Sequence, residues 1–327
     1  MKEIGGYLEL EDFRGEEYYP EAVAVNNARN GLLYLIKVRN IRKLYIPYYL
    51  CDSVSGLCER EECSYDLYPI HEDFTPAFEV SVREEEYLYV VNYFGRLDDA
   101  KILELKSKYG NIILDNVQAF FHRPLPGVDT IYSCRKFFGV PDGGYIATDA
   151  RLQEEISIDV SMDRMRHILG RYEGMCASEF YNDFKANDHS FKGLELRKMS
   201  RLTHNILMAI DYEKVRRRRE ENYTYLAENL KNINRLPDIR PVGPYMYPFY
   251  CHNGMELKKR LAAEKIYIPT LWPNVLECNR SLEKDYAENI LPLPCDQRYD
   301  VNDMQYIVDK LKNTLKSNNK YSISMEK

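Results

Sequence analysis

The sequence predicts an α/β protein whose central sheet is mainly parallel and flanked by helices. Strand-like and helix-like segments alternate through the first half of the chain, a pattern typical of parallel strands joined by helical crossovers. Two short apolar runs each end in a polar residue, Asp115 after IIL and Ser133 after DTIY. Ligands of such sheets bind at the carboxyl ends of the strands, so we expect both side chains near a site.

The elements of the first half follow from local patterns. Residues 43–47 (KLYIP) predict a strand that stops at a proline, which has no N–H for a sheet ladder. Residues 86–92 (EYLYVVN) favour a strand through their aromatic and β-branched side chains. Residues 98–108 (DDAKILELKSK) predict a helix because acidic residues open an amphipathic pattern. The other expected elements are a helix at 31–38 and strands at 65–70, 112–115, 129–133 and 144–148.

The second half predicts a smaller unit. Residues 170–192 are irregular, aromatic and polar, which favours a lid-like loop, and residues 194–232 have an almost unbroken helical period. The elements expected after them are strands at 245–252 and 266–269 and helices at 255–265 and 301–315. We therefore expect a large α/β domain with an N-terminal arm over residues 1–205. A small α+β domain over residues 206–327 follows, joined to it by the long helix.

Composition excludes several classes of function. The 327 residues are 45% hydrophobic, enough for a large core, and 45 basic residues face 51 acidic ones for a net charge of -6. No basic surface is implied, so nucleic acid is not an expected partner. The arginine run at residues 216–219 is followed by two glutamates, which favours a solvated helix face over an anion site.

The sequence also predicts a cytoplasmic protein. Its first residues (MKEIGGYLELEDF) are acidic and lack the apolar segment of a signal peptide. No run approaches the roughly 18 apolar residues of a membrane helix. The eight cysteines are scattered without a C-x-x-C pair, so free thiols are expected and a metal site is not.

The segment from residue 112 to residue 146 carries the chemistry. Asp115 ends a strand, Gln118 follows three residues later, and Lys136 stands three residues after Ser133, before a glycine-rich turn. A carboxylate of this kind pairs with the ring nitrogen of pyridoxal phosphate (PLP) and keeps the ring able to accept electrons. A lysine amine carries the cofactor as a Schiff base and then moves protons. The sequence therefore predicts PLP as the cofactor, with Asp115 and Lys136 as catalytic residues.

Each of these residues also has a plainer interpretation. A lysine after a strand is often solvated, an aspartate there often caps a turn, and a serine often satisfies local backbone. The register of Asp115 with Gln118, and the position of Lys136 between a serine and a glycine-rich turn, favour the cofactor site. Gln118 is then expected on the 3-hydroxyl of the ring or on a neighbouring group, and Ser133 on the phosphate.

A second phosphate contact is expected where a helix begins. Ala28, Arg29 and Asn30 open the predicted helix, and the free N–H groups of a helix N-terminus attract phosphate. The Arg29 guanidinium would add a bidentate cation, or it forms a structural ion pair instead.

Several segments, in this order, resemble the DegT/DnrJ/EryC1/StrS family of fold-type I PLP enzymes, best known as sugar aminotransferases. They are NNARNGLL at 26–33, IPYYLC at 46–51, NYFG at 92–95, LDNVQ at 114–118, KFFGVPDGG at 136–144 and ILPLPCDQRY at 290–299. The second, fourth and fifth match the family's V-P-x-x-T/C, D-x-x-Q and K-x-x-G…D/E-G-G motifs. The resemblance covers most of the chain. It implies a large domain around a seven-stranded-type sheet, a small C-terminal domain and a homodimer that builds its sites at the interface.

The resemblance also implies substrates and a further site position. Tyr49 and Cys51 lie where the family places a side chain against the PLP ring, although core packing is the alternative for the tyrosine. The implied reaction moves an amino group from glutamate to a keto sugar, including nucleotide-linked sugars, in surface polysaccharide or secondary-metabolite synthesis.

Two other functions stay open. One is different PLP chemistry, of the lyase or desulfurase type, because the serine-to-lysine spacing of three is shorter than in sugar aminotransferases. The other is a binding or regulatory protein with this fold and no turnover. The feature that favours this alternative is the altered phosphate turn, in which Ala28 and Arg29 replace the family's glycine and threonine.

Overall fold

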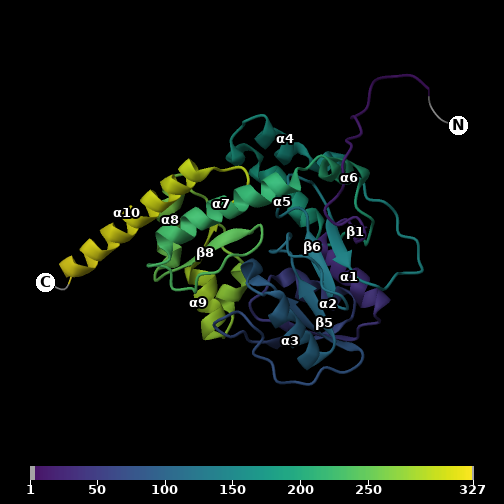
Figure 1. Cartoon of the computed structure of the whole chain (residues 1–327), viewed down its shortest axis with the longest axis horizontal. Helices are drawn as coiled ribbons and strands as arrows, with labels where there is room; N and C mark the ends of the chain where they lie inside the picture. The colour runs from purple at the N-terminus through teal and green to yellow at the C-terminus, as the bar shows by residue number, and fades with distance from the viewer. Residues whose placement is uncertain (1–3, 326–327) are drawn as a thin grey trace.

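The computed structural model of the chain describes residues 4–325, with side chains up to residue 316 (Figure 1). The elements of the first half are β1 (Val23–Val25), α1 (Ala28–Val38), β2 (Lys43–Pro47), α2 (Asp52–Arg60), β3 (Ser64–Tyr68), β4 (Glu86–Val91), η1 (Tyr93–Gly95), α3 (Asp99–Tyr109), β5 (Ile112–Asp115), β6 (Asp129–Ser133) and β7 (Gly144–Ala147). Those of the second half are η2 (Met162–Arg164), α4 (Arg166–Tyr172), η3 (Ala177–Phe180), α5 (Tyr181–Ser190), α6 (Arg201–Met208), α7 (Tyr212–Leu230), β8 (Met246–Tyr250), α8 (Gly254–Ala263), η4 (Pro273–Glu277), α9 (Ser281–Asn289), β9 (Ile290–Pro294) and α10 (Val301–Met325).

A seven-stranded sheet forms the centre of the first half. Its strand order is β1-β7-β6-β5-β4-β2-β3, and the five strands from β6 to β3 run parallel. β7 is antiparallel to both of its neighbours, β6 and β1. β5 and β6 are buried along their whole length, as parallel strands covered on both faces are. The predicted α/β class with a mainly parallel sheet is therefore confirmed.

Two helices begin where their capping residues stand. The Asn27 side chain accepts a hydrogen bond from the N–H of Asn30 at 2.8 Å and starts α1. The Asp98 side chain accepts one from the N–H of Lys101 at 2.8 Å and starts α3, within one residue of the predicted bound. Such caps satisfy first-turn donors that have no partner inside the helix.

The second half has its own small sheet and apolar cluster. β8 and β9 pair antiparallel, with Pro248 opposite Pro292, which a two-stranded sheet tolerates because both strands are edges. Residues of α7, α8 and α10 pack with these strands in a separate hydrophobic cluster. Figure 1 shows α7 lying across β8, with α10 extending beyond the body. The domain boundary between residues 205 and 206 stays a prediction.

Three predictions about the second half are wrong. Residues 170–192 are largely helical (α4 and α5), because tertiary contacts such as the bond from Asn187 Nδ2 to the Pro141 carbonyl at 3.1 Å hold a sequence of weak helical pattern. The helix expected over 194–232 is divided into α6 and α7, since the Asp211 side chain caps α7 through the N–H of Lys214 at 2.9 Å. Residues 266–269 form no strand. Their alternation arises because Ile266 and Ile268 pack into the C-terminal cluster.

Within residues 4–325, no helix is both long and apolar enough to cross a membrane.

The close approach of other backbone segments to Gly144 predicts that a larger residue there would destabilise the protein. A Cβ added there would lie 2.9 Å from each of three backbone atoms, in Asn27, Ala28 and Tyr132. Gly144→Ala is therefore expected to lower the free energy of unfolding by about 2 kcal/mol, the typical effect of overpacking a tight core. Urea unfolding measures the change.

The matched control is Gly56→Ala in α2, where the added Cβ meets nothing within 4 Å. That variant should gain about 0.5–1 kcal/mol, because alanine is the better helix former. Equal changes in the free energy of unfolding for the two variants would contradict the close backbone approach at Gly144.

Candidate active site

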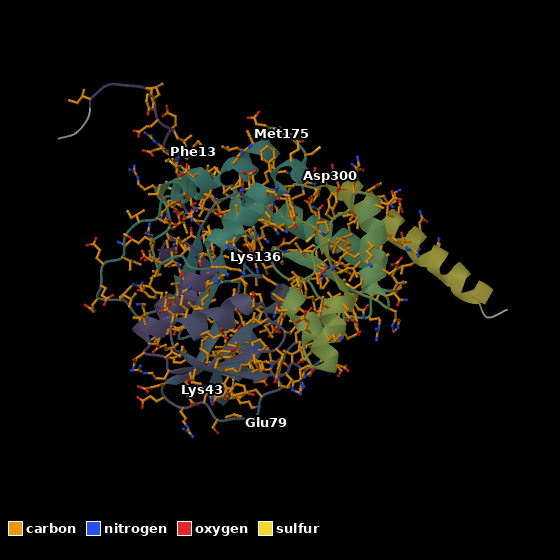
Figure 2. The ribbon with its side chains drawn as sticks, turned by 180° about the vertical axis from the view of Figure 1, so that it is seen from behind. Phe13, Lys43, Glu79, Lys136, Met175 and Asp300 are labelled. Carbon is orange, nitrogen blue, oxygen red and sulfur yellow. The ribbon has the colours of Figure 1, made fainter. Side chains whose placement is uncertain are left out.

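The candidate site lies at the carboxyl ends of β5 and β6. Asp115 ends β5 opposite Ile131 of β6, and Ser133 ends β6 opposite Gly144 of β7. Lys136 follows Ser133 in the turn toward β7. Figure 2 shows Lys136 near the middle of the molecule, where the elements of the first half meet those of the C-terminal half. Asp115 and Ser133 thus lie at the edge of the sheet where the sequence predicts them, with Lys136 in the turn beyond β6.

Asp115 is a buried carboxylate with two hydrogen-bond donors. It is 3% exposed, Oδ2 accepts from the Tyr89 hydroxyl at 2.8 Å, and Oδ1 accepts from the N–H of Val117 at 2.9 Å. Burial raises the pKa of Asp115, because removal from water disfavours the charged form. The positive charge of Lys136 and the two hydrogen bonds oppose that rise. An opposite charge placed here, such as a protonated ring nitrogen, would stabilise the carboxylate further.

Lys136 is an amine without an ion-pair partner. Among the described residues no carboxylate oxygen lies within 4.0 Å of its Nζ, which is 5.6 Å from the centre of the Tyr245 ring. The next residue is held firmly from the second half of the chain. The Phe137 carbonyl accepts hydrogen bonds from Gln297 Nε2 at 2.7 Å and from the Arg219 guanidinium at 3.2 Å. The turn that carries Lys136 is therefore held at Phe137, next to an amine that has no ion-pair partner among the described residues.

Arg219 corrects the prediction of a solvated arginine run. Arg216 and Arg218 do pair with glutamates on the surface of α7. Arg219 is only 2% exposed and also donates to the Pro244 carbonyl at 2.9 Å and to Gln297 Oε1 at 2.8 Å. Its position is in phase with the other buried residues of α7, Asn222, Tyr223, Leu226, Ala227 and Leu230. That helical phase is the signal that would have identified it.

Gln118 contributes an unsatisfied donor. The side chain is fully buried, and its Oε1 accepts from the N–H of Phe94 at 2.9 Å. Its Nε2 has no hydrogen-bond partner within the described part of the chain. Buried polar atoms nearly always have partners, so an oxygen of a bound ligand would complete this amide.

The start of α1 offers backbone donors next to Gly144. The N–H groups of Ala28 and Arg29 have no acceptor among residues 4–325, and Gly144 leaves room for the helix terminus to approach β7. The side chains of Arg29 and Asn30 bind protein instead. Arg29 donates to the Phe191 carbonyl at 2.6 Å, and Asn30 donates to the Glu195 carbonyl at 2.8 Å. The two side chains fasten residues 191–195 beside the start of α1.

Tyr49 and Cys51 occupy different surroundings. The Tyr49 ring is 1% exposed and packs against Trp272, with ring centres 4.6 Å apart. Cys51 is half-buried, and its Sγ lies 2.7 Å from the Ser53 hydroxyl. The cysteine thus contacts a neighbouring hydroxyl at the start of α2, whereas the tyrosine belongs to an aromatic cluster.

These groups fit PLP. The set contains an acid for the ring nitrogen, an amide donor that lacks an acceptor, and a lysine that lacks a carboxylate partner. The Ser133 hydroxyl also has no hydrogen-bond partner within residues 4–325, and with the two free N–H groups it can accommodate a phosphate. The roles of the individual residues in holding the cofactor stay predictions.

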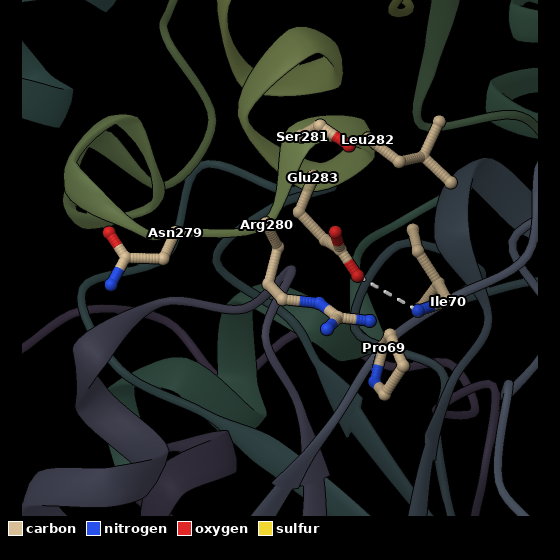
Figure 3. A pocket seen from close by; sticks show the side chains of 7 residues that line it. All are labelled: Pro69, Ile70, Asn279, Arg280, Ser281, Leu282 and Glu283. Carbon is tan, nitrogen blue, oxygen red and sulfur yellow. Dashed lines mark hydrogen bonds between the residues drawn. The ribbon is translucent and has the colours of Figure 1, made fainter.

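A separate hollow of about 260 Å³ lies between the chain after β3 and the start of α9 (Figure 3). Arg280 and Glu283 line it, and Glu283 Oε1 accepts from the N–H of Ile70 at 3.0 Å. Its described lining contains no lysine, and a carboxylate faces the same space as the guanidinium. It lacks the groups that PLP requires.

No protein-family model matches the chain, and no curated protein matches it in sequence. Solved structures do resemble it. A DegT/DnrJ/EryC1/StrS aminotransferase from Brucella abortus is 14% identical, with 90% of this chain and 85% of that chain covered and a TM-score of 0.61. The PLP form of the putative sugar aminotransferase Spr1654 from Streptococcus pneumoniae is 13% identical, with 90% and 86% covered and a TM-score of 0.63.

PseC from Helicobacter pylori, an aminotransferase involved in the biosynthesis of pseudoaminic acid, is also similar. It is 14% identical, with 90% of this chain and 87% of that chain covered and a TM-score of 0.60. At these identities the similarity shows the fold. The chain has the PLP-transferase fold, type I, that the sequence predicts.

The raised pKa of Asp115 predicts a gain in stability when the charge is removed. The folded state binds its proton more tightly than the unfolded chain, whose aspartates titrate near pH 4, so stability falls as pH rises through that window. Asp115→Asn in the cofactor-free protein should therefore be more stable than the wild type at pH 7. Thermal unfolding from pH 3 to pH 7 should show the gain fading toward low pH, where both states are protonated.

Asp149 is the control of opposite sign. Its hydrogen bond with Arg39 lowers its pKa, so it contributes stability above the unfolded pKa that is lost on acidification. Asp149→Asn should destabilise the protein slightly at pH 7. A loss of stability in both variants would show that Asp115 is not held in an unfavourable charged state.

Proposed function

We propose that the chain is a PLP-dependent aminotransferase that moves an amino group from glutamate to a keto sugar. The observation that carries this proposal is the unpaired Lys136 amine whose charge acts on the buried Asp115, at the carboxyl edge of a fold-type I sheet. The sugar acceptor is supported by the neighbours, one described as a putative sugar aminotransferase and one as involved in pseudoaminic acid biosynthesis.

Bound PLP would draw electrons from the Cα of the amino donor and so make its proton removable. Asp115 holds a proton on the ring nitrogen, and Gln118 Nε2 donates to the ring's 3-hydroxyl. Lys136 carries the cofactor. Its Nζ would serve as the base for the Cα proton of the donor. Over the whole reaction the amino group of glutamate, which becomes 2-oxoglutarate, would pass to the keto group of the acceptor.

The phosphate is held by the Ser133 hydroxyl and by the N–H groups of Ala28 and Arg29. Arg29 and Asn30 act through their side chains by closing residues 191–195 over this terminus. We assign the ring-facing position to Cys51, because the Tyr49 ring is buried in an aromatic cluster whereas Cys51 is only half-buried.

The acceptor and cellular setting follow from the same proposal. A keto sugar, including a nucleotide-linked one, places the enzyme in surface polysaccharide or secondary-metabolite synthesis in the cytoplasm. The runner-up, lyase or desulfurase chemistry, is supported by the short spacing from Ser133 to Lys136.

We also propose a homodimer. Eight large apolar side chains between residues 158 and 184 are at least 43% exposed: Ile158, Val160, Met162, Leu169, Tyr172, Met175, Tyr181 and Phe184. Large apolar side chains exposed in number on one segment favour an interface in soluble proteins. The patch lies on η2, α4 and α5 and the residues between and before them, and α5 also donates from Asn187 to the turn after Lys136. A second copy seated there would adjoin the site.

Replacement of the lysine tests the function. The wild type is expected to keep a visible absorption band of lysine-bound PLP after desalting, and L-glutamate should convert it to the pyridoxamine phosphate spectrum. Lys136→Ala should lack that band and lose about 1000-fold in glutamate-dependent amination, the scale of a lost general base. Lys108→Ala, on the exposed surface of α3, is the control and should match the wild type.

Full transamination by Lys136→Ala would refute the proposal. Release of pyruvate, ammonia or sulfide from amino acids, without amination of a keto sugar, would favour the lyase or desulfurase. Bound PLP that no amino donor changes would favour a binding protein.

Light scattering tests the homodimer. The wild type should have twice the chain mass of 38.6 kDa, and the pair Val160→Glu and Tyr172→Glu should shift it toward monomer, because both charges would be buried at the interface. Tyr267→Glu, at a residue as exposed as Val160 but outside the patch, should leave the mass unchanged. A wild-type monomer at micromolar concentration would contradict the interface.

A further inference from the structure

We propose that Tyr89 is a positioning residue for the cofactor: its hydroxyl holds Asp115 in one orientation and in the ionised state that accepts a hydrogen bond from the protonated ring nitrogen. This inference rests on the proposed PLP function. Tyr89 was not identified in the sequence, where it stands in the middle of an apolar strand pattern.

The register of two parallel strands produces the contact. Tyr89 of β4 lies opposite Ile113, and Asp115 of β5 lies opposite Val91. Tyr89 and Asp115 are therefore diagonal neighbours on the same face of the sheet, a separation that a long aromatic side chain spans. The phenol oxygen reaches Asp115 Oδ2 at 2.8 Å. Both side chains are 3% exposed, so water does not compete for the bond.

The two donors fix the carboxylate and leave it able to accept more. Tyr89 occupies one lone pair of Oδ2, and the N–H of Val117 occupies one of Oδ1. An ionised carboxylate has about four acceptor positions, so each oxygen keeps one for a ligand. With both oxygens anchored, the plane of the carboxylate is set before the cofactor arrives, and no reorientation is required on binding.

The same hydrogen bond opposes neutralisation of the acid. Burial favours the uncharged form of Asp115, and an uncharged acid cannot form an ion pair with the protonated ring nitrogen. The Tyr89 hydroxyl favours the carboxylate. Burial and the charge of Asp115 raise the pKa of Tyr89 well above its ordinary value, so the phenol keeps its proton and remains a donor at every working pH.

A purely structural role predicts different behaviour. Tyr89 also accepts at its backbone carbonyl from the Tyr68 hydroxyl at 2.7 Å, and its ring is part of the core. Loss of packing would weaken the binding of every ligand of the site to a similar degree. A role through Asp115 affects only ligands that have a ring nitrogen.

The experiment compares two ligands on one variant. Tyr89→Phe keeps the ring and removes the hydroxyl, and the dissociation constants are measured by equilibrium dialysis for PLP and for its carbocyclic analogue, in which C–H replaces the ring nitrogen. We expect Tyr89→Phe to bind PLP about tenfold more weakly, the effect of losing a hydrogen bond to a charged group. Its affinity for the analogue should change less than about twofold.

Two further variants complete the design. Tyr109→Phe removes a buried hydroxyl that donates to the Phe78 carbonyl away from Asp115, so it should leave both affinities unchanged. In an Asp115→Asn background, Tyr89→Phe should add less than about twofold to the loss, because the two residues act as one unit.

Three results overturn the inference: unchanged PLP affinity in Tyr89→Phe, equal losses for PLP and the analogue, or additive losses in the double variant. A wild type that binds no PLP would overturn the proposed function itself, which separates the two failures.

Discussion

The burial of a carboxylate at the end of β5 is the constraint on which the site depends. Asp115 is almost wholly removed from water, and a buried charge is tolerated only with hydrogen bonds or an opposite charge beside it. The Tyr89 hydroxyl, the N–H of Val117 and the charge of Lys136 each meet part of that need. Each of these partners comes from a different strand or turn, so the acid organises the carboxyl edge of the sheet.

The turn that carries the lysine is the second organised element. One carbonyl, that of Phe137, receives donors from α7 and from the chain after β9. Arg219 has no ion-pair partner within 4.0 Å among the described residues. It donates its hydrogen bonds to backbone carbonyl oxygens and to the side-chain amide oxygen of Gln297. A guanidinium suits this task because its donors point in fixed directions from one plane.

Sequence patterns predicted the features that depend on short stretches of the chain. The strand that ends at Asp115, the cap at Asp98 and the parallel sheet all follow from short windows. The proximity of Asp115 and Lys136 follows from one general rule, that parallel strands end at a common edge. Tyr89 and Arg219 could not be found in this way, because strand register and the phase of α7 decide what they touch. The helices within 170–192 were not predicted for a related reason. Their local helical pattern is weak, and contacts with distant residues stabilise them.

The two hydrogen bonds to the Phe137 carbonyl also affect how the chain can be divided. The second half has an apolar cluster of its own, but the large cluster of the first half also includes Trp272, Tyr286 and Ile290, so a cut near residue 205 would divide that cluster. It would also take both Arg219 and Gln297 away from the turn that holds Lys136, leaving a buried carbonyl without its donors. The first half of the chain therefore contains the residues of the site but not the means to keep its lysine in place. The candidate site therefore depends on residues from both halves of the chain.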